Sequence, residues 1–287
     1  MLWIGLYLEP QRSWANAAAM LITSFRNSEA RTDLSFIVSY SGVEDGQPTS
    51  IADDCIVVPR RPFGLYPSFN KIRVIELAAE LNLTQFLLLD HDIIAGPRVS
   101  DLVDNPQPEF GAVENLKVQL TAAFGSRVAD FVRKAAGCSI DDLRYFNTGV
   151  VSLNERGVQG LADAWAPIAL TAISELPNDS SPRPYCNLTM SVAAAQLQLE
   201  IVSYPTAFNQ RNWGDLPAHP VILHYNNWDA TNLIVKADIL KSREEFIEFL
   251  NSTDNRFWIA YRTLFISAVT DPSYATLADD LFAAIAR

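Results

Sequence analysis

Cysteine is scarce in this sequence. Its 287 residues include only three cysteines, Cys55, Cys138 and Cys186, which lie far apart and form no Cys-x-x-Cys pair. An odd number of isolated cysteines supports neither a disulfide framework nor a zinc knuckle. This cysteine usage fits a reducing compartment, so we expect a cytoplasmic protein.

Positive charge is also scarce. The chain has 22 Lys and Arg against 33 Asp and Glu, for a formal net charge of −11, and it has no stripe rich in Lys or Arg. This negative charge repels the phosphate backbone of nucleic acid, so we expect no nucleic acid as a partner. A small anionic ligand remains compatible with the charge, because a bound divalent cation supplies positive charge locally.

Long apolar runs are absent as well. No run approaches the roughly 20 residues that span a bilayer, so we expect no integral membrane contact. The apolar start of the chain lacks a basic n-region and runs directly into Glu9-Pro10. It therefore predicts a first strand rather than a signal peptide.

Strand-like and helix-like segments alternate through the first two thirds of the chain. Strands are expected at residues 3–8, 34–38, 55–58, 86–89, 111–113, 149–153, 201–204 and 221–224. Helices are expected at residues 14–25, 70–81, 120–136, 158–176 and 188–197, and then at 242–250, 256–269 and 274–285. This pattern predicts an α/β fold with a mostly parallel sheet flanked by helices. Ligands of such sheets gather at the carboxyl ends of the strands.

The strongest chemical signal is an apolar strand at residues 86–89 that ends in Asp90-His91-Asp92. In an extended chain, residues two apart point to the same side, so both carboxylates can reach one cation. Oxygen ligands suit Mg²⁺ or Mn²⁺, which keep open positions for phosphate oxygens. The alternative is an acidic turn without a metal, because short Asp-x-Asp patterns are common.

A second apolar strand ends in His224. A neutral imidazole is a good ligand for Mn²⁺ and would complete a set of two carboxylates and one histidine. The alternative for His224 is a structural role. His219 lies in a loop beside a proline and is the weaker candidate, while His91 should point away from the two carboxylates.

Taken in order, these motifs resemble the retaining nucleotide-sugar glycosyltransferases of family 8, which have the GT-A fold. The resemblance covers roughly residues 1–230. It rests on Asp90-His91-Asp92, on the segment Phe146-Asn147-Thr148-Gly149-Val150 and on the late strand end His224-Tyr225. The family also has a basic residue on the helix before the Asp-x-Asp strand, where Arg73 has the matching spacing and Lys71 lies close by.

The resemblance implies a GT-A (Rossmann-like) catalytic domain at residues 1–230 and a helical extension at residues 231–287. It implies that a sugar moves from a nucleotide diphosphate sugar, UDP-sugar first among them, to a glycan or other hydroxyl acceptor, with retention. It further implies a Mn²⁺ or Mg²⁺ cofactor that bridges the two phosphates of the donor.

The resemblance also assigns roles to individual residues. Asp92 and His224 are expected to bind the metal, and Asp90 to share it and to touch the ribose. Asn147 is expected to present its amide to the sugar or the acceptor, with Gly149 allowing close approach of the backbone. The expected donor contacts, placed by analogy with the fold, are Tyr7, Glu9 and Ser39 around the nucleobase, with Lys71 and Arg73 on the helix.

Two family motifs are altered. Asp-Gln near the reacting carbon is replaced by Cys186-Asn187, so Asn187 is the stand-in for that catalytic position. The late Gly-x-x-Lys-Pro-Trp is replaced by Asn226-Asn227-Trp228, which leaves Arg211 or Lys236 as substitutes for the lysine that grips the diphosphate.

Further candidates for sugar contacts have ordinary structural alternatives. Glu114 and Asn115 follow an expected strand and could bind sugar hydroxyls, and Trp213 and Trp228 could stack on the acceptor. All four could equally be surface polar or core residues.

The last third of the chain carries an apolar helical face. It consists of Phe257, Trp258, Tyr261 and Phe265. Packing against the catalytic domain is the simplest expectation, and homodimerisation or docking on a membrane surface are the alternatives.

Two other function classes stay open. One is a non-catalytic module that binds sugar nucleotides or glycans on a transferase fold. The other is a phosphatase of the haloacid dehalogenase type, which also has Asp-x-Asp after an apolar strand but places it on the first strand.

Overall fold

The fold was analysed in a computed structural model, which describes residues 1–28, 33–64, 67–115, 120, 125–176, 183–211, 215–225 and 242–286. Its centre is an eight-stranded sheet with the order β3-β4-β2-β1-β5-β8-β7-β9. These strands are β1 (Leu2–Leu8), β2 (Leu34–Ser41), β3 (Thr49–Ala52), β4 (Cys55–Arg60), β5 (Gln85–Leu89), β7 (Phe110–Glu114), β8 (Phe146–Asn154) and β9 (Ile201–Tyr204). The expected mixed sheet flanked by helices is confirmed.

The sheet is parallel where the alternating pattern is clearest. Strands β4, β2, β1 and β5 run parallel, and so do β7 and β9. Strand β8 is antiparallel to both of its neighbours, and the edge strand β3 is antiparallel to β4. As a result, β5 and β8 run in opposite directions side by side, and the end of β5 meets the beginning of β8.

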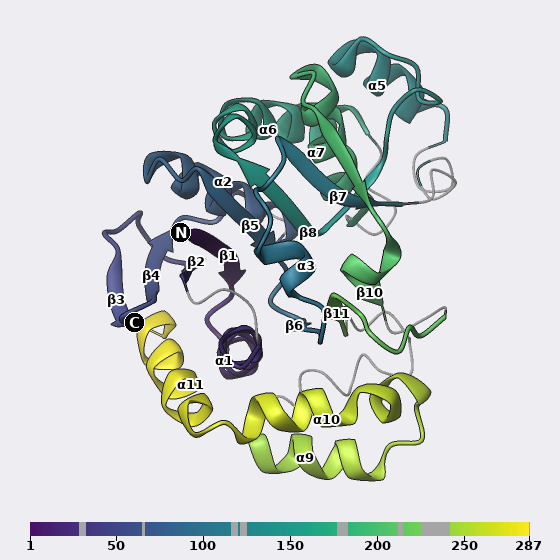
Figure 1. The fold of residues 1–287 in the computed structure, drawn as a ribbon. Helices are drawn as coiled ribbons and strands as arrows, with labels where there is room; N and C mark the ends of the chain where they lie inside the picture. The colour runs from purple at the N-terminus through teal and green to yellow at the C-terminus, as the bar shows by residue number, and fades with distance from the viewer. Residues whose placement is uncertain are drawn as a thin grey trace.

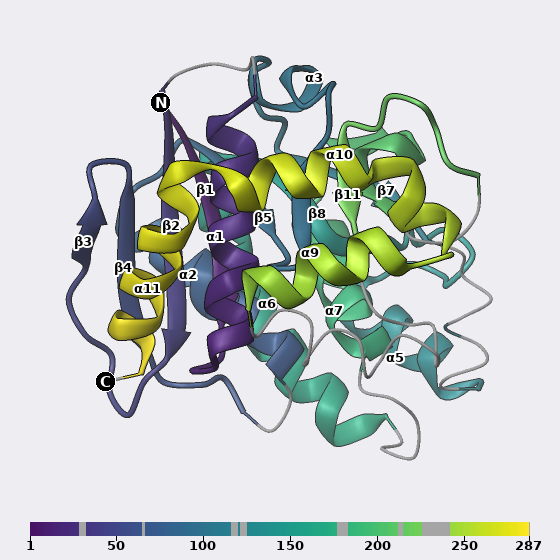
Figure 2. The same ribbon diagram turned by 90° about the horizontal axis from the view of Figure 1, so that it is seen from below.

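Helices cover both faces of the sheet (Figures 1 and 2). One face carries α1 (Arg12–Arg26) with the C-terminal helices α9 (Arg243–Ser252), α10 (Arg256–Thr270) and α11 (Pro272–Ile285). The other carries α2 (Lys71–Glu80), α5 (Arg127–Ala136), α6 (Glu155–Glu175) and α7 (Arg183–Gln196). A short helix, α3 (Ser100–Val103), follows the short strand β6 (Ile93–Ala95).

The side-chain alternation of the strands builds two separate cores. In β5, Leu87 and Leu89 belong to the core beneath α1, whereas Phe86 and Leu88 belong to the core beneath α2 and α6. All four side chains are essentially fully buried. A strand buried on both faces reads as a continuous apolar run, which is the pattern found in the sequence.

A second, small sheet lies beyond the end of β5. It consists of β10 (Gln210–Arg211), β11 (Ile222–His224) and β6 (Ile93–Ala95), in the order β10-β11-β6. Strand β11 is antiparallel to β6, and His224 pairs with Ile93. This register brings the end of β11 next to the Asp90-His91-Asp92 turn, which joins β5 to β6.

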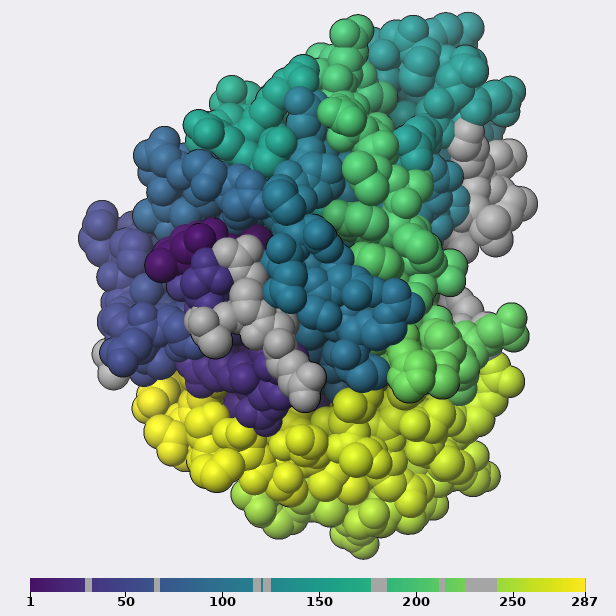
Figure 3. All heavy atoms as spheres, viewed as in Figure 1, coloured from purple at the N-terminus to yellow at the C-terminus, as the bar shows by residue number. Residues whose placement is uncertain are grey.

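The C-terminal helices belong to the same core as the sheet. Phe257, Trp258, Tyr261 and Phe265 are each at most 4% exposed, so the prediction that this face packs within the chain is confirmed. They share a cluster with Tyr225, which follows β11. In the space-filling view, α9–α11 form a continuous layer along one side of the molecule (Figure 3). The division at residue 230 and a homodimer through these helices remain predictions.

No helix within the described ranges is both long and apolar enough to cross a bilayer.

Several element boundaries differ from those expected. The helix expected at 120–136 contains a turn at Gly125-Ser126, where Gly125 has a φ of +57°, and α5 begins only at Arg127. Glycine adopts this left-handed conformation at no steric cost, so the turn can precede the start of α5. The short strands β3, β6 and β10 were not predicted.

Candidate metal and donor site

The Asp90-His91-Asp92 turn is held by backbone hydrogen bonds on both sides. The Asp90 amide donates to the Gly149 carbonyl of β8 at 2.9 Å, and the Tyr225 amide donates to the Asp92 carbonyl at 3.1 Å. Asp92 is 5% exposed, whereas Asp90 is partly open to solvent. The turn is thus fixed between the main sheet and β11, with both carboxylates on one side.

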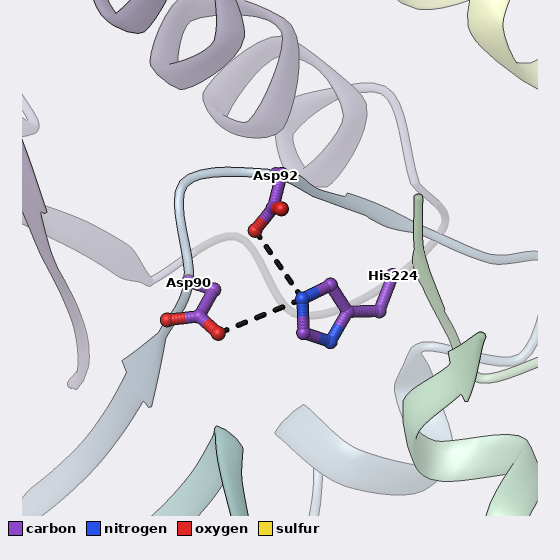
Figure 4. Close-up of side chains that lie close together, drawn as sticks. All are labelled: Asp90, Asp92 and His224. Atoms are coloured by element: carbon purple, nitrogen blue, oxygen red, sulfur yellow. Dashed lines mark ion pairs between the residues drawn. The ribbon is translucent and has the colours of Figure 1, made fainter. Parts of the chain in front are cut away.

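The two carboxylates converge on the ring of His224 (Figure 4). The His224 Nε2 atom lies 3.5 Å from Asp90 Oδ2 and 3.3 Å from Asp92 Oδ1. Ligand atoms of all three residues lie within 4.8 Å of one another. The structure therefore brings together the three residues predicted as metal ligands.

This cluster fits a divalent cation. His224 is 1% exposed, and its Nε2 has no hydrogen-bond partner among the described residues, although two carboxylates face it. A buried polar atom without a partner is costly, and a metal would satisfy it. Two carboxylates and an imidazole suit Mn²⁺, and the carboxylates also suit Mg²⁺.

The other two histidines lie elsewhere. The ring of His91 stacks on Trp14 of α1, with ring centres 3.8 Å apart. His219 is exposed in the segment before β11. Neither belongs to the cluster, as the sequence predicted.

Gly149 makes room for the His224 ring. A β-carbon at position 149 would lie 2.6 Å from His224 Cε1 and 2.8 Å from His224 Nδ1. These distances are far below van der Waals contact, so any larger residue would displace the ring. A close approach to the backbone was expected at Gly149, and in the structure the group that approaches it is the ring of His224.

Asn147 also faces inward. Its Oδ1 accepts hydrogen bonds from the Gly149 amide at 2.8 Å and from Asn209 Nδ2 at 2.5 Å. The Oδ1 of Asn209 lies in turn 2.9 Å from His224 Nδ1. The amide oxygen of Asn147 is therefore committed within the protein, which leaves its Nδ2 for a ligand.

Lys71 places a positive charge at the edge of the cluster. Its Nζ lies 2.5 Å from Asp90 Oδ1 and donates to the Thr148 carbonyl at 2.9 Å. Burial by itself lowers the pKa of this ammonium, but the nearby Asp90 and Asp92 more than offset it, so that the pKa is raised. Lys71 is consequently a permanent cation beside the carboxylates at neutral pH.

Asn187 supports Lys71 indirectly. Its Oδ1 accepts hydrogen bonds from the Thr148 amide at 3.0 Å and from Thr148 Oγ1 at 2.8 Å. Thr148 in turn holds Lys71. The thiol of Cys186 is buried in the same place, where burial raises its pKa. Asn187 thus lies near the cluster, with its amide oxygen occupied by Thr148.

A second polar group lies at the ends of β1 and β2. The Tyr7 hydroxyl is 2.6 Å from Ser41 Oγ, and Ser41 donates to Glu9 Oε2 at 2.8 Å. Burial raises the pKa of Tyr7 to about 12, so its hydroxyl stays protonated. Ser39, which was expected near the nucleobase, is fully buried inside the sheet. Ser41 lies beside Glu9 instead.

Lys71 and Arg73 face different neighbours. Arg73 pairs with Glu76 at 2.7 Å and lies over the Phe63 ring at 5.4 Å. The charge of Arg73 also acts on the Tyr7 hydroxyl, where it lowers the pKa against the larger effect of burial. Of the two basic residues predicted for this helix, Lys71 contacts the metal cluster and Arg73 lies towards Tyr7.

Of the two residues expected to replace the missing family lysine, only Arg211 lies within the described residues. It pairs with His224 in the sheet register, and its Nη2 donates to Asn115 Oδ1 at 3.1 Å. Burial lowers its pKa, against the attraction of Asp90. The other candidate, Lys236, lies outside the described residues, as do Trp213 and Trp228.

Glu114 is exposed, and its carboxylate is engaged by protein contacts. Its Oε1 accepts two hydrogen bonds from Arg144, at 2.9 and 2.7 Å, and one from Ser203. The predicted role of Glu114 in binding sugar hydroxyls stays a prediction.

Three solved structures of two glycosyltransferases have the same architecture. The galactosyltransferase LgtC, solved with donor and acceptor sugar analogs, is 13% identical, with a TM-score of 0.51 over 84% of this chain and 97% of its own. An active-site mutant of LgtC is 15% identical, with a TM-score of 0.53 over 90% of this chain and 99% of its own. The glycosyltransferase GlyE from Streptococcus pneumoniae TIGR4 is 12% identical, with a TM-score of 0.54 over 99% of this chain and 63% of its own.

The chain has the GT-A glycosyltransferase fold. No protein-family model matches the sequence, and no curated protein sequence matches it either. At such low identity, the likeness to LgtC and GlyE concerns the fold alone. It nevertheless argues against the phosphatase alternative, because in this GT-A fold Asp90 follows β5 and not the first strand, β1.

Two residues of the site were missed in the sequence. Asn209, in a short 3-10 turn at Thr206–Asn209, contacts His224, and Ser41 contacts both Tyr7 and Glu9. Extending the expected strand at residues 34–38 as far as Ser41 would have identified this serine. No motif marks Asn209, because its contacts lie far from it along the chain.

Proposed function

We propose that the protein is a metal-dependent glycosyltransferase, which moves a sugar from a nucleotide diphosphate sugar to a hydroxyl acceptor. The observation that carries the proposal is the buried His224 Nε2, which faces Asp90 and Asp92 without a hydrogen-bond partner among the described residues. The GT-A fold supports it, because LgtC, which has this fold, was solved with donor and acceptor sugar analogs.

Asp90, Asp92 and His224 would hold Mn²⁺ or Mg²⁺. When bound, the ion supplies positive charge that offsets the negative charge growing on the leaving diphosphate. The chain adds cations of its own at this place, because Lys71 lies beside Asp90 and Arg211 pairs with His224 in the sheet. Both would attract the anionic donor to a protein that otherwise repels it.

The nucleoside would lie at the ends of β1 and β2. Tyr7, Ser41 and Glu9 form a connected polar group there, and Arg73 lies nearby. A uracil base, and hence a UDP-sugar, is our first choice of donor. Residues 1–230 would form the catalytic unit, and retention of configuration would follow from the resemblance to family 8.

A donor-hydrolysis assay tests this function. The protein would be incubated with a panel of nucleotide diphosphate sugars with Mn²⁺, with Mg²⁺ and with EDTA, and the released nucleoside diphosphate would be measured. We expect release from one donor class, its loss with EDTA, and faster release when an acceptor sugar is added. Nucleotide binding without release from any donor would instead indicate the non-catalytic binding module.

Replacing Lys71 by methionine should have opposite effects on the metal and on the donor. Without the ammonium 2.5 Å from Asp90, the two carboxylates lose a competing cation, so the dissociation constant for Mn²⁺ alone should fall roughly tenfold, or about 1.4 kcal/mol. Binding of the anionic donor should weaken by about the same factor, because it loses the attraction of the ammonium. Calorimetric titration measures both.

Lys134→Met is the matched control for this prediction. Lys134 is an exposed lysine on α5 that pairs with Glu175 of α6, and neither residue belongs to the metal cluster, so both affinities should stay unchanged. If Lys71→Met weakened binding of Mn²⁺ alone, the ammonium would be supporting the metal site rather than competing for it.

A further inference from the structure

A line of hydrogen bonds leads from the backbone of β8 to the ring of His224. The Gly149 amide donates to Asn147 Oδ1 at 2.8 Å, Asn209 Nδ2 donates to the same oxygen at 2.5 Å, and Asn209 Oδ1 lies 2.9 Å from His224 Nδ1. The side chains of Asn147, Asn209 and His224 are at most 8% exposed. Bulk water therefore does not compete for these hydrogen bonds.

The first of these bonds fixes the direction of all the others. A backbone amide can only donate, so the atom of Asn147 that faces Gly149 must be its oxygen. The atom of Asn209 that faces this oxygen must then be its NH₂ group, which turns the Asn209 oxygen towards His224. An amide oxygen can only accept, so the proton of a neutral His224 ring lies on Nδ1.

The consequence appears at the opposite nitrogen of the ring. With the proton on Nδ1, the lone pair of Nε2 points at Asp90 and Asp92, at 3.5 and 3.3 Å. The other tautomer would place a proton on Nε2, where the carboxylates could accept it and where it would have to leave before a metal could bind.

We propose that Asn209 is a positioning residue, which holds His224 in the Nδ1-protonated tautomer and thereby keeps Nε2 ready to bind a metal. The tautomer follows from the hydrogen bonds alone, and its use in metal binding rests on the function proposed above. The amide of Asn209 does both through two separate atoms, since its oxygen accepts from His224 and its NH₂ group donates to Asn147.

Two measurements on Asn209→Leu test this assignment. The first is ¹⁵N NMR of the metal-free protein at alkaline pH, where the protonated and the unprotonated ring nitrogen of His224 have separate signals. The wild type should show the proton on Nδ1, and Asn209→Leu should shift the population towards Nε2. The second is calorimetry with Mn²⁺ alone, in which affinity should fall about 10–100-fold, the range for loss of a partner behind a metal ligand.

A buried amide side chain outside this line provides the matched control. Gln107 is 5% exposed and its Nε2 donates to the Leu102 and Asn105 carbonyls, so Gln107→Leu removes a buried amide that makes no bond to Asn147, Asn209 or His224. Its tautomer and Mn²⁺ affinity should match those of the wild type. Asn209→Asp keeps an oxygen facing His224 Nδ1, so this isosteric variant should retain the Nδ1-protonated tautomer.

The two readouts separate this inference from the proposed function. A wild-type ring protonated on Nε2, or an unchanged tautomer in Asn209→Leu, would overturn the role of Asn209 whatever the metal does. The expected tautomers without any binding of Mn²⁺ would uphold the hydrogen-bond line and contradict the metal site instead.

Discussion

Asp92→Ala should abolish measurable binding of Mn²⁺. Asp92 is the more buried carboxylate of the cluster, and its Oδ1 lies 3.3 Å from His224 Nε2. Loss of a direct ligand should cost more than the about 10–100-fold that follows the loss of an outer partner. Donor turnover should then fall on the order of 10³-fold, which corresponds to about 4 kcal/mol of transition-state stabilisation.

The matched control for this substitution is Asp163→Ala. Asp163 is an exposed aspartate on α6 and does not belong to the metal cluster, so metal binding and turnover should remain at the wild-type level. Circular dichroism would establish that both variants are folded. Full turnover by a folded Asp92→Ala protein would show that Asp92 has no part in the reaction.

Trp258→Ala should produce the largest loss of stability among single substitutions in the C-terminal helices. Trp258 is 3% exposed and contacts several aromatic rings, with centroid distances of 4.8 Å to Phe265, 5.4 Å to Phe249 and 5.8 Å to Tyr225. Truncating such a residue leaves a cavity, which costs about 3–5 kcal/mol in the free energy of unfolding. Urea denaturation measures this change.

The neighbouring residue gives the control. Ile259 is 49% exposed on the same helix, so Ile259→Ala should change the free energy of unfolding by no more than about 0.5 kcal/mol. Equal stability of the two variants would contradict the central place of Trp258 in this core.

The same cluster connects the C-terminal helices to the metal site. Tyr225 packs on Trp258 and Phe265, and its amide donates to the Asp92 carbonyl at 3.1 Å. Tyr225 also follows His224 directly in the chain. The helices after residue 242 therefore support the backbone that carries two of the three candidate ligands.

The candidate ligands could be predicted because each follows a strand with a strong apolar pattern. Buried strands such as β5 are recognisable in the sequence, and their carboxyl ends mark where ligands gather. The spacing of Asp90 and Asp92 placed both on one side. That His224 lies beside them depends on the pairing of β11 with β6, for which the family resemblance, and not the local pattern, was the guide.

The choice between Lys71 and Arg73 could not be made from spacing alone. Two residues along a helix lie about 200° apart around its axis, so only one of them can face the metal cluster. The 3-10 turn at Pro67–Asn70 sets where α2 begins and how it is rotated. No local pattern in the sequence gives that rotation.

Ser41 was missed because β2 is longer than expected. The strand continues to Ser41, three residues past the predicted end, so Ser39 lies inside the sheet and Ser41 at its edge. Asn209 was missed for a different reason, since its contacts with Asn147 and His224 join segments that are 62 and 15 residues apart.

Calorimetry of nucleoside diphosphate binding is the most direct test of the proposed donor site. Nucleoside diphosphates with different bases would be titrated into the wild-type protein with Mn²⁺ and with EDTA. We predict that one nucleoside diphosphate, UDP first among them, binds with Mn²⁺ and that this binding is lost with EDTA. Failure of every nucleotide to bind with either Mn²⁺ or Mg²⁺ would contradict the assignment of Asp90, Asp92 and His224 to a metal that holds the donor.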